Sequence, residues 1–300
     1  MKAPSISVCI LNYNYGRYLG QAIDSALGQQ PGKYRLAEVL VIDDGSTDNS
    51  LDVCAGYGES IRVVKCEHRG FAETLTEAIQ RATSDWVALL DADDWFAPHK
   101  LATVAAAMTP DCLLVQHWEH VVKADGSPLL DRPHPGGNMS TLVVRRDAAL
   151  DLLPVTNEVF LHVFDYLGRG VKLIDPLMHY RVHDSNMTDR TRPGFWQDYL
   201  RKVSAEVAER LRALAQTPPP WADERNLRRL AWHFAASSNG HAREAAVQRR
   251  QRGLALKATT AELCSALIAR RAISARFAGL RSALTMRPIV RLDSRQHQDS

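Results

Sequence analysis

Three carboxylates stand together in the segment Asp91-Ala92-Asp93-Asp94, directly after the apolar run 86–90. A short apolar run of this kind is typical of a buried strand, so we expect the carboxylates at the end of a strand. Crowded carboxylates favour a bound cation, and Mg²⁺ and Mn²⁺ take oxygen ligands while keeping positions open for phosphate oxygens. The segment therefore indicates a site for a divalent cation and a diphosphate. A solvated acidic turn is the alternative interpretation.

A second acidic turn, Asp43-Asp44-Gly45-Ser46-Thr47-Asp48, follows the apolar run 39–42 and precedes a candidate helix. Gly45 permits a tight turn, and Ser46, Thr47 or Asp48 is suited to cap the helix that follows. The carboxyl ends of parallel strands lie along one edge of a sheet, where ligands of open α/β sheets bind. Asp43 and Asp44 are therefore expected at the same edge as Asp91.

The composition is that of a globular protein: 300 residues, 45% hydrophobic and 24% charged, which suits one large domain or two modest ones. The five cysteines are odd in number, widely spaced and form no Cys-x-x-Cys pair, which disfavours a disulfide framework or a zinc site. The start of the chain lacks the pattern of a secretory signal, and no apolar run is long enough to cross a bilayer. We expect a cytoplasmic protein, with the inner face of the membrane as a further location.

The net charge of +3 hides an uneven distribution of charge along the chain. Residues 201–300 contain 19 Lys and Arg against 8 Asp and Glu, whereas residues 1–200 contain 18 against 26. A basic C-terminal region is compatible with nucleic-acid binding, with attachment to an anionic membrane surface, or with a solvated helical face.

Short apolar runs alternate with amphipathic periods over the first 110 residues. Leu19, Ile23 and Leu27 recur every four residues, which predicts a helix with one apolar face. The pattern predicts strands at 6–11, 38–43, 61–66 and 86–90 and helices at 18–29, 48–55, 71–82 and 98–108. Repeated strand-helix-strand units predict a parallel sheet with helices on both sides.

After residue 111 the pattern changes to a strand at 112–116, a hairpin turn at 124–127, a Pro/Gly-rich loop at 132–137, a strand at 141–145, a helix at 158–168 and an extended segment at 176–183. Beyond residue 191 the chain is predicted to form helices, separated by breaks at 218–220 and 237–240.

Three motifs in order resemble the family 2 glycosyltransferases of GT-A fold, inverting enzymes that use nucleotide-diphosphate sugars. They are Ser7-Val8-Cys9-Ile10-Leu11-Asn12-Tyr13-Asn14, the turn that begins at Asp43, and the segment that ends at Asp94. The resemblance covers about residues 5–190. It implies a GT-A catalytic domain at 1–190, with a Rossmann-like, mostly parallel sheet flanked by helices, and a basic α-helical C-terminal region at 191–300. It also implies a UDP-sugar donor, a glycan or lipid-linked acceptor, and a role in cell-envelope or extracellular polysaccharide synthesis.

The same resemblance assigns residues to the donor. Tyr13 would lie against the nucleotide base, and Asp44, with Asp43, would accept a hydrogen bond from it. The cation, Mn²⁺ or Mg²⁺, would be held by Asp91, Asp93 and His183. Donor contacts would come from Leu11, Tyr13, Asn14, Asp43, Asp44, Asp91, Ala92 and Arg181. Tyr13 as a packed aromatic, His183 as a structural histidine and Arg181 as the partner of an acidic group are the alternatives.

The general base is less clearly marked. Relatives carry an acidic pair in a helix before a glycine that here corresponds to Gly170, whereas this chain has Asn157-Glu158-Val159. Glu158 is the candidate base and Asp165 the second choice. The chain also has His68 where relatives have the Asn of an Asn-x-Gly, and Leu75-Thr76 where they have an Arg-Asn pair.

Two other classes of function compete with the transferase. A non-catalytic nucleotide- or nucleic-acid-binding protein would use the basic C-terminal helices, but their aromatic residues are sparse and do not interleave with the arginines. A nucleotidyltransferase or cyclase would need a Gly-rich phosphate loop, and no strand-to-helix turn of this sequence supplies one.

Overall fold

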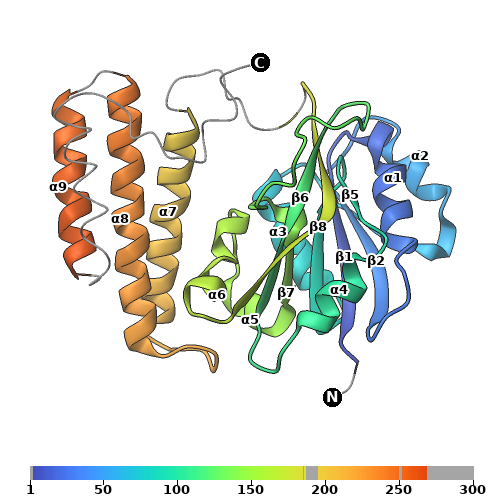
Figure 1. Cartoon of the computed structure of the whole chain (residues 1–300), viewed down its shortest axis with the longest axis horizontal. Coiled ribbons are helices and arrows are strands. Elements are labelled where there is room, and N and C mark those ends of the chain that lie inside the picture. Colours follow the sequence, from blue (N-terminus) through green and yellow to red (C-terminus); the bar gives the residue numbers. More distant parts are fainter. Residues whose placement is uncertain (1–2, 185, 187–194, 250–251, 269–300) are drawn as a thin grey trace. The chain divides into compact units, whose positions relative to one another are not determined.

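The computed structural model describes residues 3–184, 186, 195–249 and 252–268 (Figure 1). The chain divides into two compact units, Met1–Ser185 and Asn186–Ser300. The boundary predicted at residue 190 and the last part of the basic region, 269–300, lie outside the described residues.

The first unit begins with the predicted alternation of strands and helices. The strands are β1 Ser5–Asn12, β2 Arg35–Asp43, β3 Arg62–Lys65 and β4 Trp86–Asp91, and the helices are α1 Gly16–Leu27, α2 Ser50–Ala55, α3 Phe71–Arg81 and α4 Lys100–Ala107. A single turn of 3-10 helix, η1 Gly58–Ser60, and a two-residue strand, β5 Trp95–Phe96, complete this part. Each predicted strand and helix is present, with its ends shifted by a few residues.

The second half of the unit contains β6 Leu114–Lys123, η2 Met139–Thr141, β7 Leu142–Arg145, α5 Arg146–Leu152, η3 Glu158–Phe160, α6 Val163–Tyr166 and β8 Gly170–Val182. The hairpin turn is confirmed, with Gly126 at φ 85°. The continuous helix predicted at 158–168 is wrong. Asn157 accepts a hydrogen bond from the main-chain N–H of Val159 (2.9 Å), and Leu161 N–H bonds back three residues to Glu158 O (2.9 Å), so the segment forms η3 and α6, two short turns.

The eight strands form one sheet in the order β3-β2-β1-β4-β7-β6-β8-β5. β1 pairs in parallel with β2 and β4, β2 with β3, and β6 with β8, while β7 is antiparallel to both of its neighbours and β5 is antiparallel to β8. The predicted parallel arrangement holds without exception for the first four strands. The sheet as a whole is mixed, and most of its pairings are parallel.

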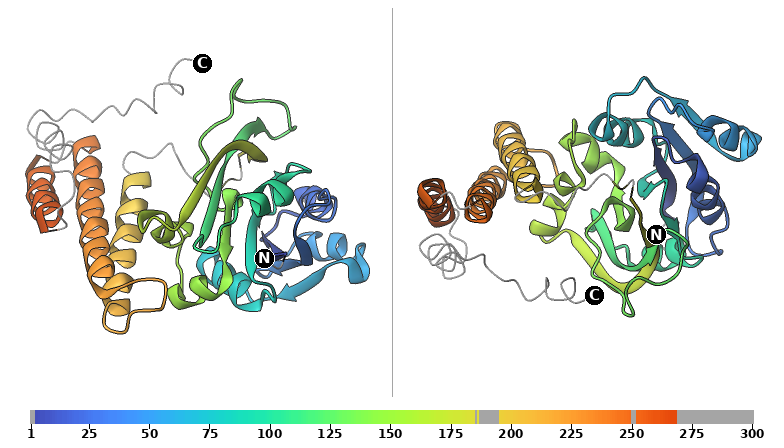
Figure 2. Two further views of the ribbon diagram at one scale, coloured as in Figure 1. Left: turned by 60° about the horizontal axis from the view of Figure 1, so that its bottom comes forward. Right: turned by 90° about the horizontal axis from the view of Figure 1, so that it is seen from above.

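Helices cover both faces of the first strands (Figure 2). Val8 and Ile10 of β1 belong to one buried cluster with Leu19 of α1. Cys9, which points to the opposite face because side chains alternate along a strand, donates its thiol hydrogen to Ala78 O of α3 (3.6 Å). The predicted α/β architecture is therefore confirmed, and it fixes the strand ends that carry the acidic turns.

The second unit consists of α7 Phe195–Leu214, α8 Glu224–Gln248 and α9 Arg252–Ile268. The break predicted at 218–220 is confirmed, but the break predicted at 237–240 is wrong, because α8 runs through it. Gly240 serves packing instead: a Cβ there would lie 3.0 Å from Glu262 Oε1 of α9. Arg243 Nε and Glu262 Oε2 form a buried ion pair (3.1 Å) at this contact. None of the helices in the described part of the chain has the length and apolar content needed to span a membrane.

Candidate active site

The two acidic turns flank the end of the central strand β1. In the register of the sheet Asn12 is opposite Asp43 of β2, and Leu11 is opposite Asp91 of β4. The main chain continues each pairing by one step, since Asp44 N–H donates to Asn12 O (2.9 Å) and Ala92 N–H donates to Leu11 O (3.0 Å). The main-chain carbonyls of Asn12 and Leu11 therefore hold the first and the second turn side by side at the carboxyl edge of the sheet.

Asp43 is buried in the first turn with both carboxylate oxygens hydrogen-bonded. Its Oδ1 accepts from Ser46 N–H (3.0 Å) and its Oδ2 from the Asn12 side-chain amide (2.7 Å). Gly45 makes the turn possible, because its φ is 74° and a Cβ would lie 2.8 Å from His68 N. Asp43 thus shapes the turn from inside the protein.

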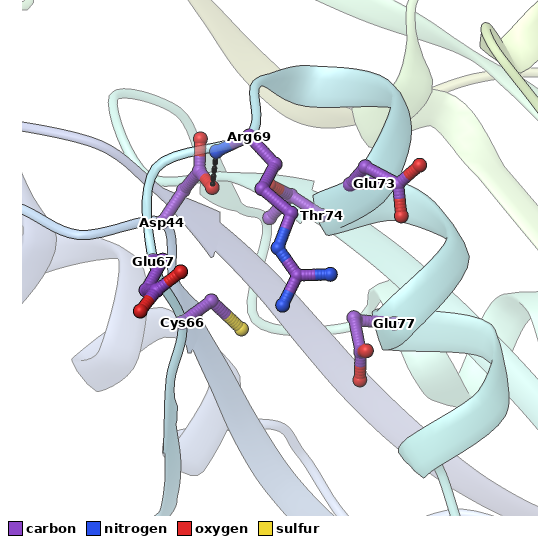
Figure 3. Close-up of a pocket in the computed structure, with 7 residues that line it drawn as sticks. All are labelled: Asp44, Cys66, Glu67, Arg69, Glu73, Thr74 and Glu77. Atoms are coloured by element: carbon purple, nitrogen blue, oxygen red, sulfur yellow. Dashed lines mark hydrogen bonds between the residues drawn. The ribbon is translucent and has the colours of Figure 1, made fainter.

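Asp44 is also buried and accepts hydrogen bonds from the loop that precedes α3. Arg69 N–H donates to Oδ1 (2.9 Å), which Figure 3 shows as a dashed line, and Gly70 N–H donates to Oδ2 (2.8 Å). The Arg69 side chain points away from this carboxylate, along α3 towards Glu77 (Figure 3). The adjoining cavity measures about 10 Å³, room for about one water molecule and not for a sugar nucleotide.

Tyr13 and Asn14 follow β1 directly and differ in exposure and partners. Asn14 has a left-handed backbone (φ 57°), and its Oδ1 accepts from Thr47 N–H (2.7 Å), so this residue ties β1 to the first turn. Tyr13 is 41% exposed and its ring lies parallel to that of His68, with the centroids 4.0 Å apart. His68 Nδ1 is in turn 2.8 Å from Asp44 Oδ2.

The second turn places its three carboxylates in a crowded setting. Asp94 is buried and accepts from Ser140 Oγ–H (2.7 Å) and Arg181 N–H (2.9 Å). Asp91 lies 3.3 Å from the same Ser140 hydroxyl, and Asp93 Oδ2 lies 3.0 Å from His183 Nε2. Of the three residues that the sequence assigned to the cation, the structure places Asp93 beside His183 and puts the charge of Asp93 close enough to act on Asp91.

The pKa values report an excess of negative charge at this turn. Burial, and then the charges of Asp93 and Glu158, hold the pKa of Asp91 well above its ordinary value. Burial and the charges of Asp93 and Asp91 do the same to the pKa of Asp94. Each of these carboxylates would be more stable as an anion beside a cation.

Residues 7–135 match the family model described as glycosyl transferase family 2. These residues form a family 2 glycosyltransferase domain. The chain is 28% identical over 214 residues to an uncharacterized glycosyltransferase of Nostoc sp., across 60% of this chain and 66% of that protein. It is 31% identical over 103 residues to glycosyltransferase GlyG of Streptococcus pneumoniae, across 33% of each. The matches thus span less than two thirds of these relatives' length.

Solved structures share the fold of the family 2 domain at low sequence identity. TarS of S. aureus in complex with UDP-GlcNAc aligns with a TM-score of 0.57 and 16% identity, over 93% of this chain and 90% of that one. TarS in complex with UDP aligns with a TM-score of 0.53 and 15% identity, over 94% and 91%. At this level of identity the likeness shows the fold.

Arg181 of β8 lies outside the matched residues and forms several contacts inside the first unit. Its Nε donates to Asp93 O (2.8 Å) and its Nη1 to Ala124 O (2.7 Å). Its guanidinium lies between the rings of Tyr18 (4.4 Å) and Trp95 (4.6 Å), and the residue is 4% exposed. Arg181 thus links the second acidic turn to the hairpin after β6.

Ser140 and Lys100 are site residues that the sequence analysis missed. Lys100 is fully buried behind the second turn, donates to Ser140 O (2.7 Å) and lies 3.4 Å above the Phe96 ring. Burial holds its pKa well below the ordinary value, against the charge of Asp94. No local pattern marks Ser140, which reaches the carboxylates from 46 residues away in the chain.

The two candidate bases differ in their surroundings. Glu158 begins η3, close enough for its charge to act on Asp91, and burial raises the pKa of Glu158 to about 7. Asp165 in α6 instead forms an ion pair with Lys172 (Oδ2 to Nζ 2.9 Å). The structure therefore joins Glu158, and not Asp165, to the electrostatics of the second turn.

A divalent cation fits these residues only in part. In the part of the chain that the structure describes, no group of three or more His, Cys, Asp or Glu side chains could hold a metal ion. Mg²⁺ is commonly held by one or two carboxylates and completed by water and substrate phosphates. Asp91, whose pKa is raised by burial and by neighbouring carboxylates, and the nearby Asp93 suit a cation of this kind.

Proposed function

We propose that this chain transfers a sugar from a nucleotide-diphosphate donor, a UDP-sugar, to an acceptor hydroxyl with inversion of the anomeric configuration. The observation that carries the proposal is the placement of Asp43 and Asp91 on either side of the β1 end. This places one turn whose carboxylates are hydrogen-bonded and one turn whose crowded carboxylates have raised pKa values along the same sheet edge, which suits an uncharged base followed by a diphosphate bound through a cation.

The nucleotide would extend across this edge. In the proposal Tyr13, the exposed aromatic, stacks on the base, and Asp44 accepts a hydrogen bond from it. Leu11, Asn14, Asp43 and Ala92 shape this part of the site through their main-chain and side-chain hydrogen bonds. The complexes of TarS with UDP and UDP-GlcNAc support a uridine nucleotide as the donor.

The diphosphate would lie at the second turn. Asp91 and Asp93, with His183 beside Asp93, would hold Mn²⁺ or Mg²⁺ there. A bound divalent ion supplies positive charge to a diphosphate leaving group. Arg181 contributes by fixing the main chain of Asp93, so we assign it a positioning role.

We assign the general base to Glu158. A carboxylate with a pKa of about 7 accepts a proton more readily than an ordinary glutamate and is still about half ionised at neutral pH. In the proposal it takes the proton of the acceptor hydroxyl as the oxygen attacks the anomeric carbon opposite the diphosphate. A single attack of this kind inverts the configuration and needs no covalent intermediate.

The catalytic part would be residues 1–190, and the acceptor a glycan or a lipid-linked saccharide of a cell-envelope or extracellular polysaccharide. For the basic C-terminal helices we propose peripheral contact with an anionic membrane surface. The sparse aromatic residues of this region do not interleave with its arginines, which favours this role over nucleic-acid binding. Salt-sensitive binding to anionic vesicles, absent with neutral ones, would support it.

The proposed function is tested by a thermal-shift panel of nucleoside diphosphates and nucleotide sugars, with and without Mn²⁺. A ligand that binds only the folded protein stabilises it by about 2.7 kcal/mol at a hundred times its Kd. We expect a uridine nucleotide to raise the melting temperature of the wild-type chain, and Asp93→Asn to lose the part of the shift that depends on Mn²⁺. A panel in which no nucleotide moves the melting temperature contradicts the proposal.

A further inference from the structure

His68 makes both of the contacts that the proposed function assigns to a nucleobase. Its imidazole is planar against Tyr13, with centroids 4.0 Å apart and ring planes inclined by 14°. Its Nδ1 lies 2.8 Å from Asp44 Oδ2 and 3.2 Å from Asp44 O. Both partners are acceptors, so we assign the hydrogen to Nδ1, which then donates to the carboxylate as a ring N–H of a base would.

His68 occupies a position on the Asp44 carboxylate that a base in this site would use. A carboxylate offers about four lone-pair positions. Three are taken at Asp44, by Arg69 N–H on Oδ1 and by Gly70 N–H and His68 Nδ1 on Oδ2. The side chain of Asp44 is only 5% exposed. One face of the Tyr13 ring is covered by the same imidazole.

The His68 side chain is able to leave without unfolding its loop. It is 53% exposed, whereas the loop itself is held to Asp44 by the main chain of Arg69 and Gly70. A change of rotamer at His68 would therefore free one face of Tyr13 and one position on Asp44, and the loop would stay in place.

We propose that His68 holds the nucleobase position of the donor site in the ligand-free protein and that the base of the donor displaces it. This inference rests on the proposed function. The ligand that can replace both contacts of His68 is a planar base with a ring N–H, such as uracil. His68 thereby sets the affinity of the site, since donor binding must break one aromatic stack and one hydrogen bond before it forms its own.

The first test compares the affinity of the full-length chain for UDP by isothermal titration calorimetry in the presence of Mg²⁺. His68→Ala removes the competing side chain, so its Kd for UDP is expected to be about two- to tenfold lower than that of the wild type. Arg69→Lys is the matched control, because it keeps the charge of the neighbouring side chain and the main-chain bond to Asp44, and it should bind as the wild type does.

The outcomes separate this inference from the proposed function. A Kd of His68→Ala that is unchanged or higher shows that His68 is neutral or a wall of the base site, which overturns the inference and leaves the function intact. UDP binding absent from all three proteins removes both.

The second test follows the His68 ring by NMR, with its signals assigned by their loss in His68→Asn. Stacking on Tyr13 shifts the ring protons upfield, and Tyr13→Leu should abolish that shift without any ligand. Saturation with UDP and Mg²⁺ should move the wild-type signals to the positions found in Tyr13→Leu. Signals that keep their upfield positions in the UDP complex overturn the inference.

Discussion

The two acidic turns at the sheet edge have similar sequences and opposite electrostatic situations. In the first turn each carboxylate oxygen of Asp43 and Asp44 accepts a hydrogen bond from a main-chain or side-chain donor of the protein. In the second, Asp94 accepts from Ser140 and from Arg181 N–H and Asp91 lies 3.3 Å from the same serine hydroxyl, yet burial and the charges of neighbouring carboxylates raise the pKa of both.

The difference shows that the role of an acidic residue at a strand end depends on which groups surround its carboxylate. Donors aimed at a carboxylate stabilise the anion within the protein, so the first turn is complete and serves shape and recognition. Carboxylates that face one another leave a deficit of positive charge that a ligand can supply. Substitutions at the two turns can therefore separate a turn that depends on a cation from one that does not.

The largest effect is expected from Asp93→Asn. This substitution keeps the size of the side chain and removes one charge from the second turn, so sugar transfer should fall by about three orders of magnitude. Turnover measured against Mn²⁺ concentration, with folding checked by circular dichroism, tests this. Turnover near the wild-type rate, with the same dependence on Mn²⁺, would place the cation elsewhere.

Glu158→Gln removes the proposed base and keeps the shape of η3. Transfer should fall by about two to three orders of magnitude while the Kd for the donor is unchanged, because the base acts on the acceptor. Rates and donor affinity measured on the same preparation separate the two effects. Asp165→Asn, which breaks only the surface pair with Lys172, is the matched control and should retain most of the activity.

The pH dependence gives an independent check on Glu158. Its pKa is raised to about 7, so the carboxylate is protonated below that pH and cannot take up the acceptor proton. In the wild type kcat/KM should fall tenfold per pH unit below about pH 7 and level off above it. A slope of the same size in Glu158→Gln would assign the titration to another group.

The position of the two turns at the sheet edge could be predicted from the sequence, because each turn follows its own apolar run. The parallel register of β1, β2 and β4 then brings Asp43 and Asp91 to one edge by rules that need no distant contacts. The antiparallel strand β7 beside β4, which carries Ser140 to the site from the turn before it, leaves no such local pattern.

The wrong break at 237–240 and the missed residue Lys100 both have their origin in long-range packing. The residues at 237–240 have the composition of a loop, yet Gly240 is small because Glu262 of α9 approaches it. A lysine at the start of a helix, such as Lys100, is usually solvated, yet this one is buried against Ser140 and Phe96. A charged or small side chain whose role depends on a distant partner cannot be assigned from its own segment.

Ser140 offers a smaller and more specific test of the second turn. Ser140→Ala removes the hydroxyl that donates to Asp94 and accepts from Asp91 N–H (3.0 Å), whereas Ser140→Thr keeps it. We expect about a 10- to 100-fold loss of Mn²⁺ affinity in Ser140→Ala, measured in the presence of UDP, and partial rescue in Ser140→Thr. Equal losses in the two variants would mean that packing at the buried site, and not the hydroxyl, is responsible.

The smallest effect, and the most direct contrast between the turns, is on stability in EDTA at pH 8. Asp43→Asn turns an acceptor of the Asn12 amide or of Ser46 N–H into a donor and should lower the free energy of unfolding by about 1–3 kcal/mol. Asp91→Asn keeps an acceptor for Ser140 and removes a repelled charge, so it should raise that free energy, by about 1 kcal/mol.

The pH dependence of the Asp91→Asn effect follows from the raised pKa of Asp91. The folded protein binds the Asp91 proton more tightly than the unfolded chain does, so the wild type loses stability as pH rises above the ordinary carboxyl range. The gain from Asp91→Asn should therefore be present at pH 8 and vanish in acid, below the pKa of the unfolded chain. Urea unfolding at both pH values measures it. The contrary result is that Asp91→Asn destabilises the metal-free chain at pH 8, as Asp43→Asn does. The carboxylates of both turns would then be stabilised by the protein without a cation, and the two turns would not differ electrostatically.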